Sequence, residues 1–226
     1  MNSDRQETKG VVMTKTLLGK VPVVAVLAIL IAVLATPVSA GGGGISLKGQ
    51  AGRFDTTTFK ALGNSTDAQA SWTNKVALDG KFSMFLEKTT DDQFAFAAAV
   101  VDGVNGQTVG SLGDLAFSFT GVCNGGSPRF NLFYSNDGGI TNGILFLGCN
   151  NVTLTTPTGA PDWQTATFSH AFILAGGSGG GSCPDPCSIN DTSTVTSLSV
   201  LIDIVGSNNI DRVSVNGVTT GEPNGS

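Results

Sequence analysis

The segment from Leu115 to Cys149, LAFSFTGVCNGGSPRFNLFYSNDGGITNGILFLGC, decides the fold of this chain. In its first part, Leu115, Phe117 and Phe119 alternate with small side chains, and a second run repeats the alternation after a glycine-rich turn. A period of two is typical of a strand with one buried face. The last part, residues 143–149, is almost wholly apolar, as expected of a central strand buried on both faces. The segment predicts three consecutive strands with a cysteine near each end.

Further short apolar runs, separated by turn residues, occupy most of the chain after residue 44. The run from 93 to 101 is rich in alanine but alternates, so we predict a strand there and not a helix. Asp79-Gly80 is a two-residue hairpin signal. About ten short strands predict an all-β protein, a two-sheet antiparallel β-sandwich that is jelly-roll-like. Besides the opening segment, the expected strands are 45–48, 53–62, 72–78, 81–88, 93–101, 152–155, 163–175, 195–205 and 209–216.

The first forty residues have the pattern of a signal peptide. Two lysines precede the apolar run 21–35, and Pro37-Val38-Ser39-Ala40 supplies small residues of the kind that a signal peptidase recognises. The alternative is an uncleaved anchor, because about 20 apolar residues suffice to span a bilayer. Cleavage after Ala40 would leave 41–226 as a single domain, in which we expect residues 176–188 to form a flexible glycine-rich loop.

The charge of the mature chain limits its partners. Residues 41–226 contain 8 basic and 15 acidic side chains, a net charge of −7. Nucleic acid and anionic membrane surfaces need clustered lysine and arginine, so both are disfavoured. Few charges with many Gly, Ser, Thr and Asn residues are typical of a secreted β protein, and we predict an extracellular location.

Four cysteines in an exported chain favour disulfides over a metal site. Our preferred pairing is Cys123–Cys149 and Cys183–Cys187. The first would close a loop that stabilises the fold by about 3 kcal/mol in the chain-entropy model. The second would close the Cys-Pro-Asp-Pro-Cys segment. A zinc site is the alternative, but Cys123 and Cys149 lack the closely spaced partner cysteines of a zinc knuckle.

The sequence gives little support for catalysis. His170 is the only histidine, and in the expected strand it shares a face with Phe168 and Phe172, which indicates a packed or partly buried side chain. No Gly-x-Ser-x-Gly elbow between a strand and a helix accompanies it, because the one match to that pattern lies in the low-complexity tract 176–182. A glycosidase needs two opposed carboxyl groups, whereas Glu87 lies beside a lysine on a strand and Glu222 lies in the tail. An aspartate-only site is the remaining enzymatic alternative, and we predict a protein that is not an enzyme.

A binding module is the function that the sequence favours. Sugar recognition often combines an exposed aromatic ring with amide and guanidinium groups. Trp163 is the candidate ring because its strand neighbours are threonine and serine, although it could instead cover the rim of the sandwich. Arg129 and Asn131 share the strand face opposite Phe130, which makes them candidate ligand-binding residues. Trp72 is assigned to the core.

The segment Asn209–Gly217, NIDRVSVNG, resembles the final strand of jelly-roll carbohydrate-binding modules, which often ends in a similar Asp-x-Val-x-Val run. In that family an aspartate near this position helps to ligate a structural calcium, so the resemblance implies Asp211 as a metal ligand. We predict no other cofactor. The segments 126–130 and 146–149 also resemble a group of secreted bacterial proteins, which implies no particular activity.

We therefore predict a secreted, non-catalytic module that binds carbohydrate or another cell-envelope glycan. The alternative is a surface-coat or filament subunit, whose N-terminal segment could add a strand to the sheet of a neighbour. Four Asn-x-Ser/Thr sequons are compatible with a glycosylated surface protein, but such sequons also arise by chance in a chain rich in these residues. They begin at Asn64, Asn151, Asn190 and Asn224.

Overall fold

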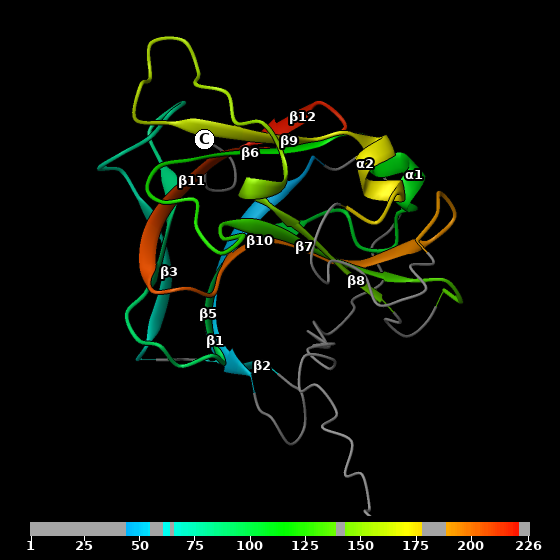
Figure 1. Ribbon diagram of the computed structural model, residues 1–226, viewed down its shortest axis with the longest axis horizontal. Helices are drawn as coiled ribbons and strands as arrows, with labels where there is room; N and C mark the ends of the chain where they lie inside the picture. The colour runs from blue at the N-terminus through cyan, green and yellow to red at the C-terminus, as the bar shows by residue number, and fades with distance from the viewer. Residues whose placement is uncertain (1–43, 55–60, 64–65, 139–142, 178–188, 222–226) are drawn as a thin grey trace, which may run out of the picture.

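A computed structural model describes residues 44–54, 61–63, 66–138, 143–177 and 189–221 of the 226-residue chain. These residues form two antiparallel β-sheets that pack face to face (Figure 1). In spatial order, sheet A contains β2 (Ala61–Gly63), β1 (Ser46–Phe54), β5 (Ala95–Asp102), β10 (Thr194–Ile202), β7 (Arg129–Ser135) and β8 (Gly143–Gly148). Sheet B contains β3 (Ala68–Thr73), β4 (Ser83–Lys88), β11 (Gly206–Val215), β6 (Leu115–Phe119) and β9 (Gln164–Phe168), with β12 (Val218–Thr220) paired to β11.

The core lies between the sheets and is formed by the inward halves of the alternating strands. Phe117 of β6 and Phe130 of β7 come from different sheets, and their ring centroids are 5.1 Å apart in an edge-to-face arrangement. Phe168 of β9 contacts both rings, at 6.1 and 5.9 Å. Burial of each such ring contributes about 1.5–3 kcal/mol. This aromatic cluster therefore holds the two sheets together.

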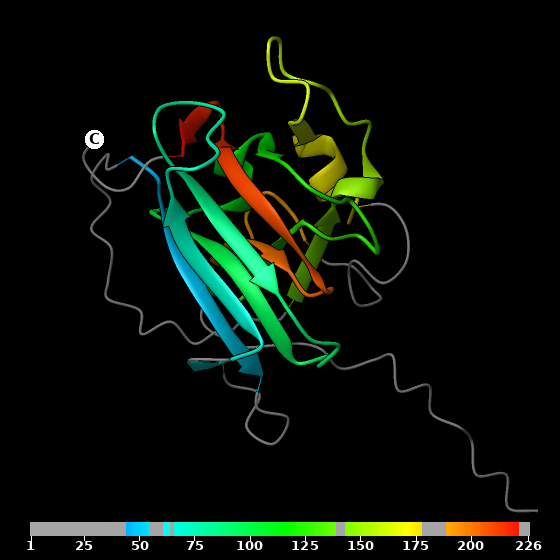
Figure 2. The ribbon, with the colours of Figure 1, turned by 90° about the vertical axis from the view of Figure 1, so that its left-hand side faces the viewer.

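At the other end of sheet B, β3 and β4 run close beside β1 and β5 (Figure 2). Gly49 of β1 makes this approach close. A methyl group at this position would lie 3.0 Å from both the carbonyl oxygen of Ala70 in β3 and the sulfur of Met84 in β4. The absence of a side chain thus lets the edge of sheet B approach β1.

The described helices are short. α1 (Val109–Leu112) precedes β6, α2 (His170–Leu174) follows β9, and the 3₁₀ turn η1 (Cys149–Asn151) follows β8. The hydroxyl of Ser169 caps α2 by accepting the Phe172 N–H at 3.2 Å. No helix among the described residues is long and apolar enough to span a membrane.

The predicted fold class is confirmed. β5 is a strand, as its alternation indicated, and β6, β7 and β8 lie where the opening segment placed three strands. One detail is wrong, because β8 ends the path of paired strands in sheet A instead of occupying its centre, although most of its residues are buried. The three strands are divided between the sheets, with β6 in sheet B and β7 and β8 in sheet A.

Several predicted strand boundaries are also wrong. Separate strands were expected over 45–48 and 53–62, whereas β1 runs continuously from Ser46 to Phe54. The strand expected over 163–175 ends at Phe168, because the Ser169 cap starts α2 there. The strand expected over 72–78 ends at Thr73, so Asp79-Gly80 lies in a longer loop between β3 and β4 and not in a two-residue hairpin. The strand expected over 152–155 is reduced to a single bridge between Thr155 and Thr165.

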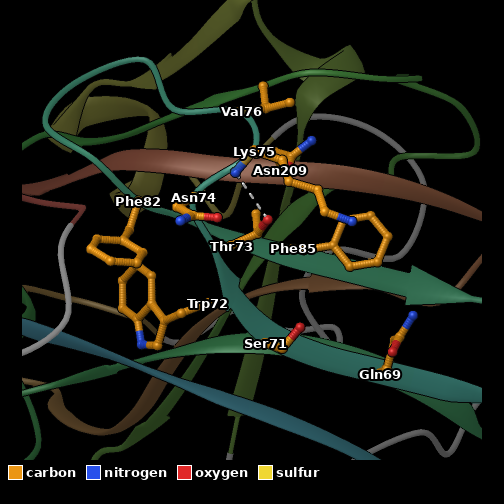
Figure 3. A pocket seen from close by; sticks show the side chains of 10 residues that line it. All are labelled: Gln69, Ser71, Trp72, Thr73, Asn74, Lys75, Val76, Phe82, Phe85 and Asn209. Carbon is orange, nitrogen blue, oxygen red and sulfur yellow. Dashed lines mark hydrogen bonds between the residues drawn. The ribbon is translucent and has the colours of Figure 1, made fainter.

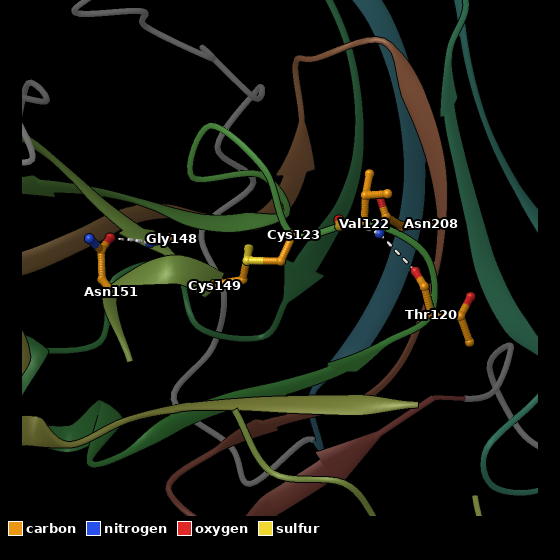
Figure 4. The surroundings of a disulfide bond; sticks show 7 residues. All are labelled: Thr120, Val122, Cys123, Gly148, Cys149, Asn151 and Asn208. Atoms are coloured by element: carbon orange, nitrogen blue, oxygen red, sulfur yellow. Dashed lines mark hydrogen bonds between the residues drawn. A yellow bond between two sulfur atoms is a disulfide. The ribbon is translucent and has the colours of Figure 1, made fainter. Parts of the chain in front are cut away.

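The predicted disulfide between Cys123 and Cys149 is confirmed (Figure 4). It joins the segment after β6, in sheet B, to the end of β8, in sheet A. The bond therefore cross-links the two layers near one edge of the sandwich. The Cys183–Cys187 pair, the signal peptide 1–40, most of the 176–188 loop and the sequons at Asn64 and Asn224 lie outside the described residues.

Candidate functional site

On the outer face of β3, β4 and β11, one aromatic side chain is surrounded by polar side chains. The strand register places Ser71, Phe85 and Asn209 in one row across the three strands. The neighbouring row contains Gln69, Glu87 and Ser207. Since side chains alternate along a strand, Phe85 points away from the core that Met84 and Leu86 enter. A partly exposed ring thus occupies the centre of a polar surface.

A pocket of about 620 Å³ lies over this face (Figure 3). Its volume falls in the range of about 300–1,000 Å³ found for small-molecule sites. Figure 3 shows Trp72 and Phe82 on one side of the pocket and Phe85 on the other. The lining combines these rings with amides, hydroxyls and one ammonium group: Gln69, Ser71, Trp72, Thr73, Asn74, Lys75, Val76, Phe82, Phe85 and Asn209. We call it the first pocket.

Hydrogen bonds beneath the first pocket fix its polar groups. The buried hydroxyl of Ser83 donates to the carbonyl oxygen of Val76 and contacts Asn209 Oδ1 at 3.3 Å. Asn209 Nδ2 in turn donates to the Thr120 hydroxyl at 3.1 Å. The Lys75 N–H donates to Thr73 Oγ1 at 3.3 Å. These contacts hold the start of the β3–β4 loop against the sheet, so the rim is organised before a ligand binds.

Asp211 of β11 fastens the same loop farther along. Its side chain is fully buried, and Oδ2 accepts the N–H groups of Leu78 and Asp79 at 2.8 and 3.1 Å. Oδ1 accepts the Arg212 N–H at 2.7 Å. Burial raises the pKa of the Asp211 carboxyl, and the three backbone N–H groups oppose this rise. Asp211 is therefore a structural link between β11 and the loop that borders the first pocket.

The contacts of Asp211 show whether its surroundings suit the calcium ion that the family resemblance implied. Calcium takes six to eight oxygen ligands, whereas the groups that contact Asp211 here are N–H donors. No group of three or more His, Cys, Asp or Glu side chains suited to a metal ion occurs among the described residues. Within the described part of the chain, the surroundings of this carboxylate thus do not fit a calcium ligand set, and the calcium that the resemblance implied at Asp211 is untested.

A second pocket adjoins the first on the far side of Trp72. Its volume is about 720 Å³. It lies where β1 approaches β3, and its lining includes Lys48 and Asp102. Ser71 and Trp72 line both pockets. The indole also packs against the core, so Trp72 has both the core role predicted from the sequence and a surface role that the prediction missed.

Arg129 and Asn131 lie together on the outer face of sheet A, as predicted, but their polar groups are engaged. Arg129 Nε donates to Asn131 Oδ1 at 2.9 Å. Both terminal nitrogens donate to the Asp203 carboxylate, at 2.7 and 2.6 Å, and the guanidinium lies 4.9 Å from the centre of the Phe146 ring. The Arg129 side chain is only 12% exposed. This pair forms a fixed ion-pair network and not an open polar surface.

Trp163 does not lie on the same surface as Arg129 and Asn131. It directly precedes β9, which ends the path of paired strands in sheet B, and it is only 5% exposed. The expectation that its ring lies on an exposed polar face is therefore wrong, and the covering role weighed as the alternative agrees with this burial. Arg129 and Asn131 lie on sheet A, whereas Trp163 is buried next to β9 of sheet B, so the three candidate ligand-binding residues do not form one surface.

His170 lies at the start of α2 and not on a strand. Its Nε2 is 2.7 Å from Asp191 Oδ1, and its backbone N–H donates to Asp114 Oδ1 at 2.8 Å. The side chain is 28% exposed, which agrees with the predicted partly buried histidine. Within the described residues, no hydroxyl is among the hydrogen-bond partners of this imidazole. These contacts tie α2 to the loops that precede β6 and β10.

The residues that form the first pocket were missed, although one signal was present. Phe85 alternates with the core residues Met84 and Leu86, so the period-two rule already places it on the outer face with Glu87. Phe82 shares the parity of Met84 and Leu86, but it precedes β4 and lines the pocket. The contribution of Asn209 depends on the pairing of β4 with β11, which no local pattern indicates.

No protein-family model matches the chain, and no curated protein matches its sequence. Among solved structures, the family 30 carbohydrate-binding module of the cellulosomal cellulase Cel9D-Cel44B of Clostridium thermocellum is 14% identical, with a TM-score of 0.47, over 75% of this chain and 91% of that chain. The family 11 module of the cellulase Lic26A-Cel5E of the same organism is 13% identical, with a TM-score of 0.44, over 81% of this chain and 91% of that chain. In its two-sheet architecture the chain is similar to these carbohydrate-binding modules.

Proposed function

We propose that the protein is a secreted, non-catalytic module that binds carbohydrate or a cell-envelope glycan in the first pocket. The observation that carries the proposal is the position of Phe85 at the centre of a polar three-strand face, inside a pocket that Trp72 also lines. An aromatic face suits the apolar side of a sugar ring, and amide and hydroxyl groups suit its hydroxyls.

The chemistry of the two outer faces favours this location. On the outer face of sheet A, the described residues Phe96, Ala98 and Leu201 form a small apolar cluster and are buried. The face of β3, β4 and β11 instead combines exposed polar side chains with partly exposed rings. Because Ser83 and Asp211 hold the bordering loop, little ordering of this loop would oppose binding.

A glycan array followed by calorimetry on the bound sugars tests the proposal. We expect Phe85→Ala to weaken binding by about tenfold, because stacking and apolar contact are lost. The fold should persist, since this ring points away from the core. Phe146→Ala is the matched control, because it removes a ring from the outer face of the other sheet. If Phe85→Ala bound the sugars as tightly as the wild type does, the assignment of the binding site to the first pocket would be wrong.

Two further measurements address the other functions. Release of reducing ends from a polysaccharide by the purified protein would show that it is an enzyme. Polymers in size-exclusion chromatography, together with an absence of glycan binding, would favour the surface-coat or filament subunit.

A further inference from the structure

Each of the two pockets is lined by one lysine whose ammonium group has no partner among the described residues. Lys75 lines the first pocket and Lys48 lines the second, and both side chains are exposed. Neither ammonium forms a hydrogen bond or an ion pair with any described residue. Of the other described cations, Arg53, Arg129 and Arg212 pair with aspartates, the Lys88 ammonium donates to the Asp203 carbonyl oxygen, and Lys81 also has a partner.

The two pockets adjoin, because Ser71 and Trp72 line both, and we call the two together the groove. The groove begins on the outer face of sheet B and crosses the edge strand β3 toward β1 of sheet A. Lys75 lines only the first pocket and Lys48 only the second, whereas Trp72 lines both. A chain of sugars that follows the groove would therefore meet a cation, an aromatic ring and a second cation.

We propose that this groove binds an anionic oligosaccharide, whose carboxylate or sulfate groups meet Lys75 in the first pocket and Lys48 in the second while Trp72 contacts the sugar between them. The inference rests on the proposed carbohydrate-binding function and adds the class of sugar. Lysine suits this role because its ammonium is a compact charge that can follow a flexible ligand. A net charge of −5 for the whole chain makes two unengaged cations on one groove notable.

One acidic side chain in the second pocket opposes the positive charge of the two lysines. Asp102 is exposed and lines the second pocket together with Lys48. Its charge should repel an anionic sugar, so its removal should strengthen binding of such a ligand. This opposite sign gives the proposal a second test that does not depend on the loss of a contact.

The test is calorimetry on the full chain with three tetrasaccharides: tetragalacturonate, a carrageenan tetrasaccharide and neutral cellotetraose. Lys75→Gln and Lys48→Gln should each weaken binding of one or both anionic probes by about two- to fivefold, as expected for exposed ion pairs. Asp102→Asn should strengthen it by a similar factor. Arg53→Gln is the matched control, because it removes a cation that pairs with Asp92, and it should change nothing.

The outcomes separate this inference from the proposed function. Stronger binding of the carboxylated or of the sulfated probe identifies the anion, and added salt should weaken it. Binding of cellotetraose that is as tight as binding of the anionic probes, and that depends on Phe85, would overturn the anionic ligand and leave the carbohydrate-binding function intact. An absence of binding to both anionic probes would also overturn the anionic ligand, whereas the proposed function fails only if the glycan array shows no bound sugar.

Discussion

Truncation of Asp211 should destabilise the protein, because its carboxylate holds the β3–β4 loop. This loop lies far from Asp211 in the sequence but contacts it in the fold. Asp211→Ala leaves the N–H groups of Leu78, Asp79 and Arg212 without their acceptor. A buried donor that loses its partner costs about 1–3 kcal/mol. Asp79 is exposed and its N–H can be hydrated, and removal of a desolvated charge offsets part of the loss. We therefore expect the free energy of unfolding to fall by about 2–3 kcal/mol.

Urea unfolding at neutral pH measures this loss, provided that the slope against urea is unchanged. Asp79→Ala is the matched control, because it removes an exposed carboxylate from the same loop. Its effect should stay within about 0.5 kcal/mol. If Asp211→Ala were as stable as Asp79→Ala, the argument that Asp211 holds the β3–β4 loop would be wrong.

The same carboxyl should make stability depend on pH in a defined direction. Burial raises its pKa above the ordinary value of 3.8, so the folded state keeps this proton to a higher pH than the unfolded state does. The resulting stability is fully present below the unfolded pKa and is lost as the pH rises through the folded pKa. Asp211→Asn cannot titrate. The stability of the wild type minus that of Asp211→Asn should therefore decrease as the pH rises from below 3.8, and a constant difference would contradict the raised pKa.

Three further predictions concern packing, the cross-link and metal. Gly143→Ala should cost about 2–3 kcal/mol in urea unfolding, because the added methyl would overlap the buried Tyr134 ring, whereas Gly44→Ala meets no neighbour and should cost nothing. Reduction of Cys123–Cys149, in a variant whose other two cysteines are alanine, should lower the stability by about 3.5 kcal/mol, given the separation of 26 residues. EDTA should leave the Tm unchanged, because N–H donors already satisfy the buried carboxylate of β11; a drop in Tm that calcium reverses would show a calcium site.

The fold could be predicted from the sequence because its determinants are local. Alternation identified β5 as a strand despite its alanines, and it separated the core side of β7 from the face of Arg129 and Asn131. Alternation says which face of a strand is buried, but it does not say which strands pair. Nothing in the opening segment therefore indicates that β6 belongs to sheet B while β7 and β8 belong to sheet A.

The candidate site depends on pairing, and this explains why so little of it was predicted. The face of Phe85 follows from β4 alone, but its significance comes from Ser71 and Asn209, which flank it only because β3 and β11 pair with β4. Arg129 shows the reverse case. Its face was predicted correctly, yet Asp203, 74 residues away in the sequence, accepts two of its hydrogen bonds. A guanidinium has five N–H donors, and three of them are engaged within the protein. The face of a strand can thus be predicted locally, whereas the availability of a side chain to a ligand depends on neighbours that only the folded chain supplies.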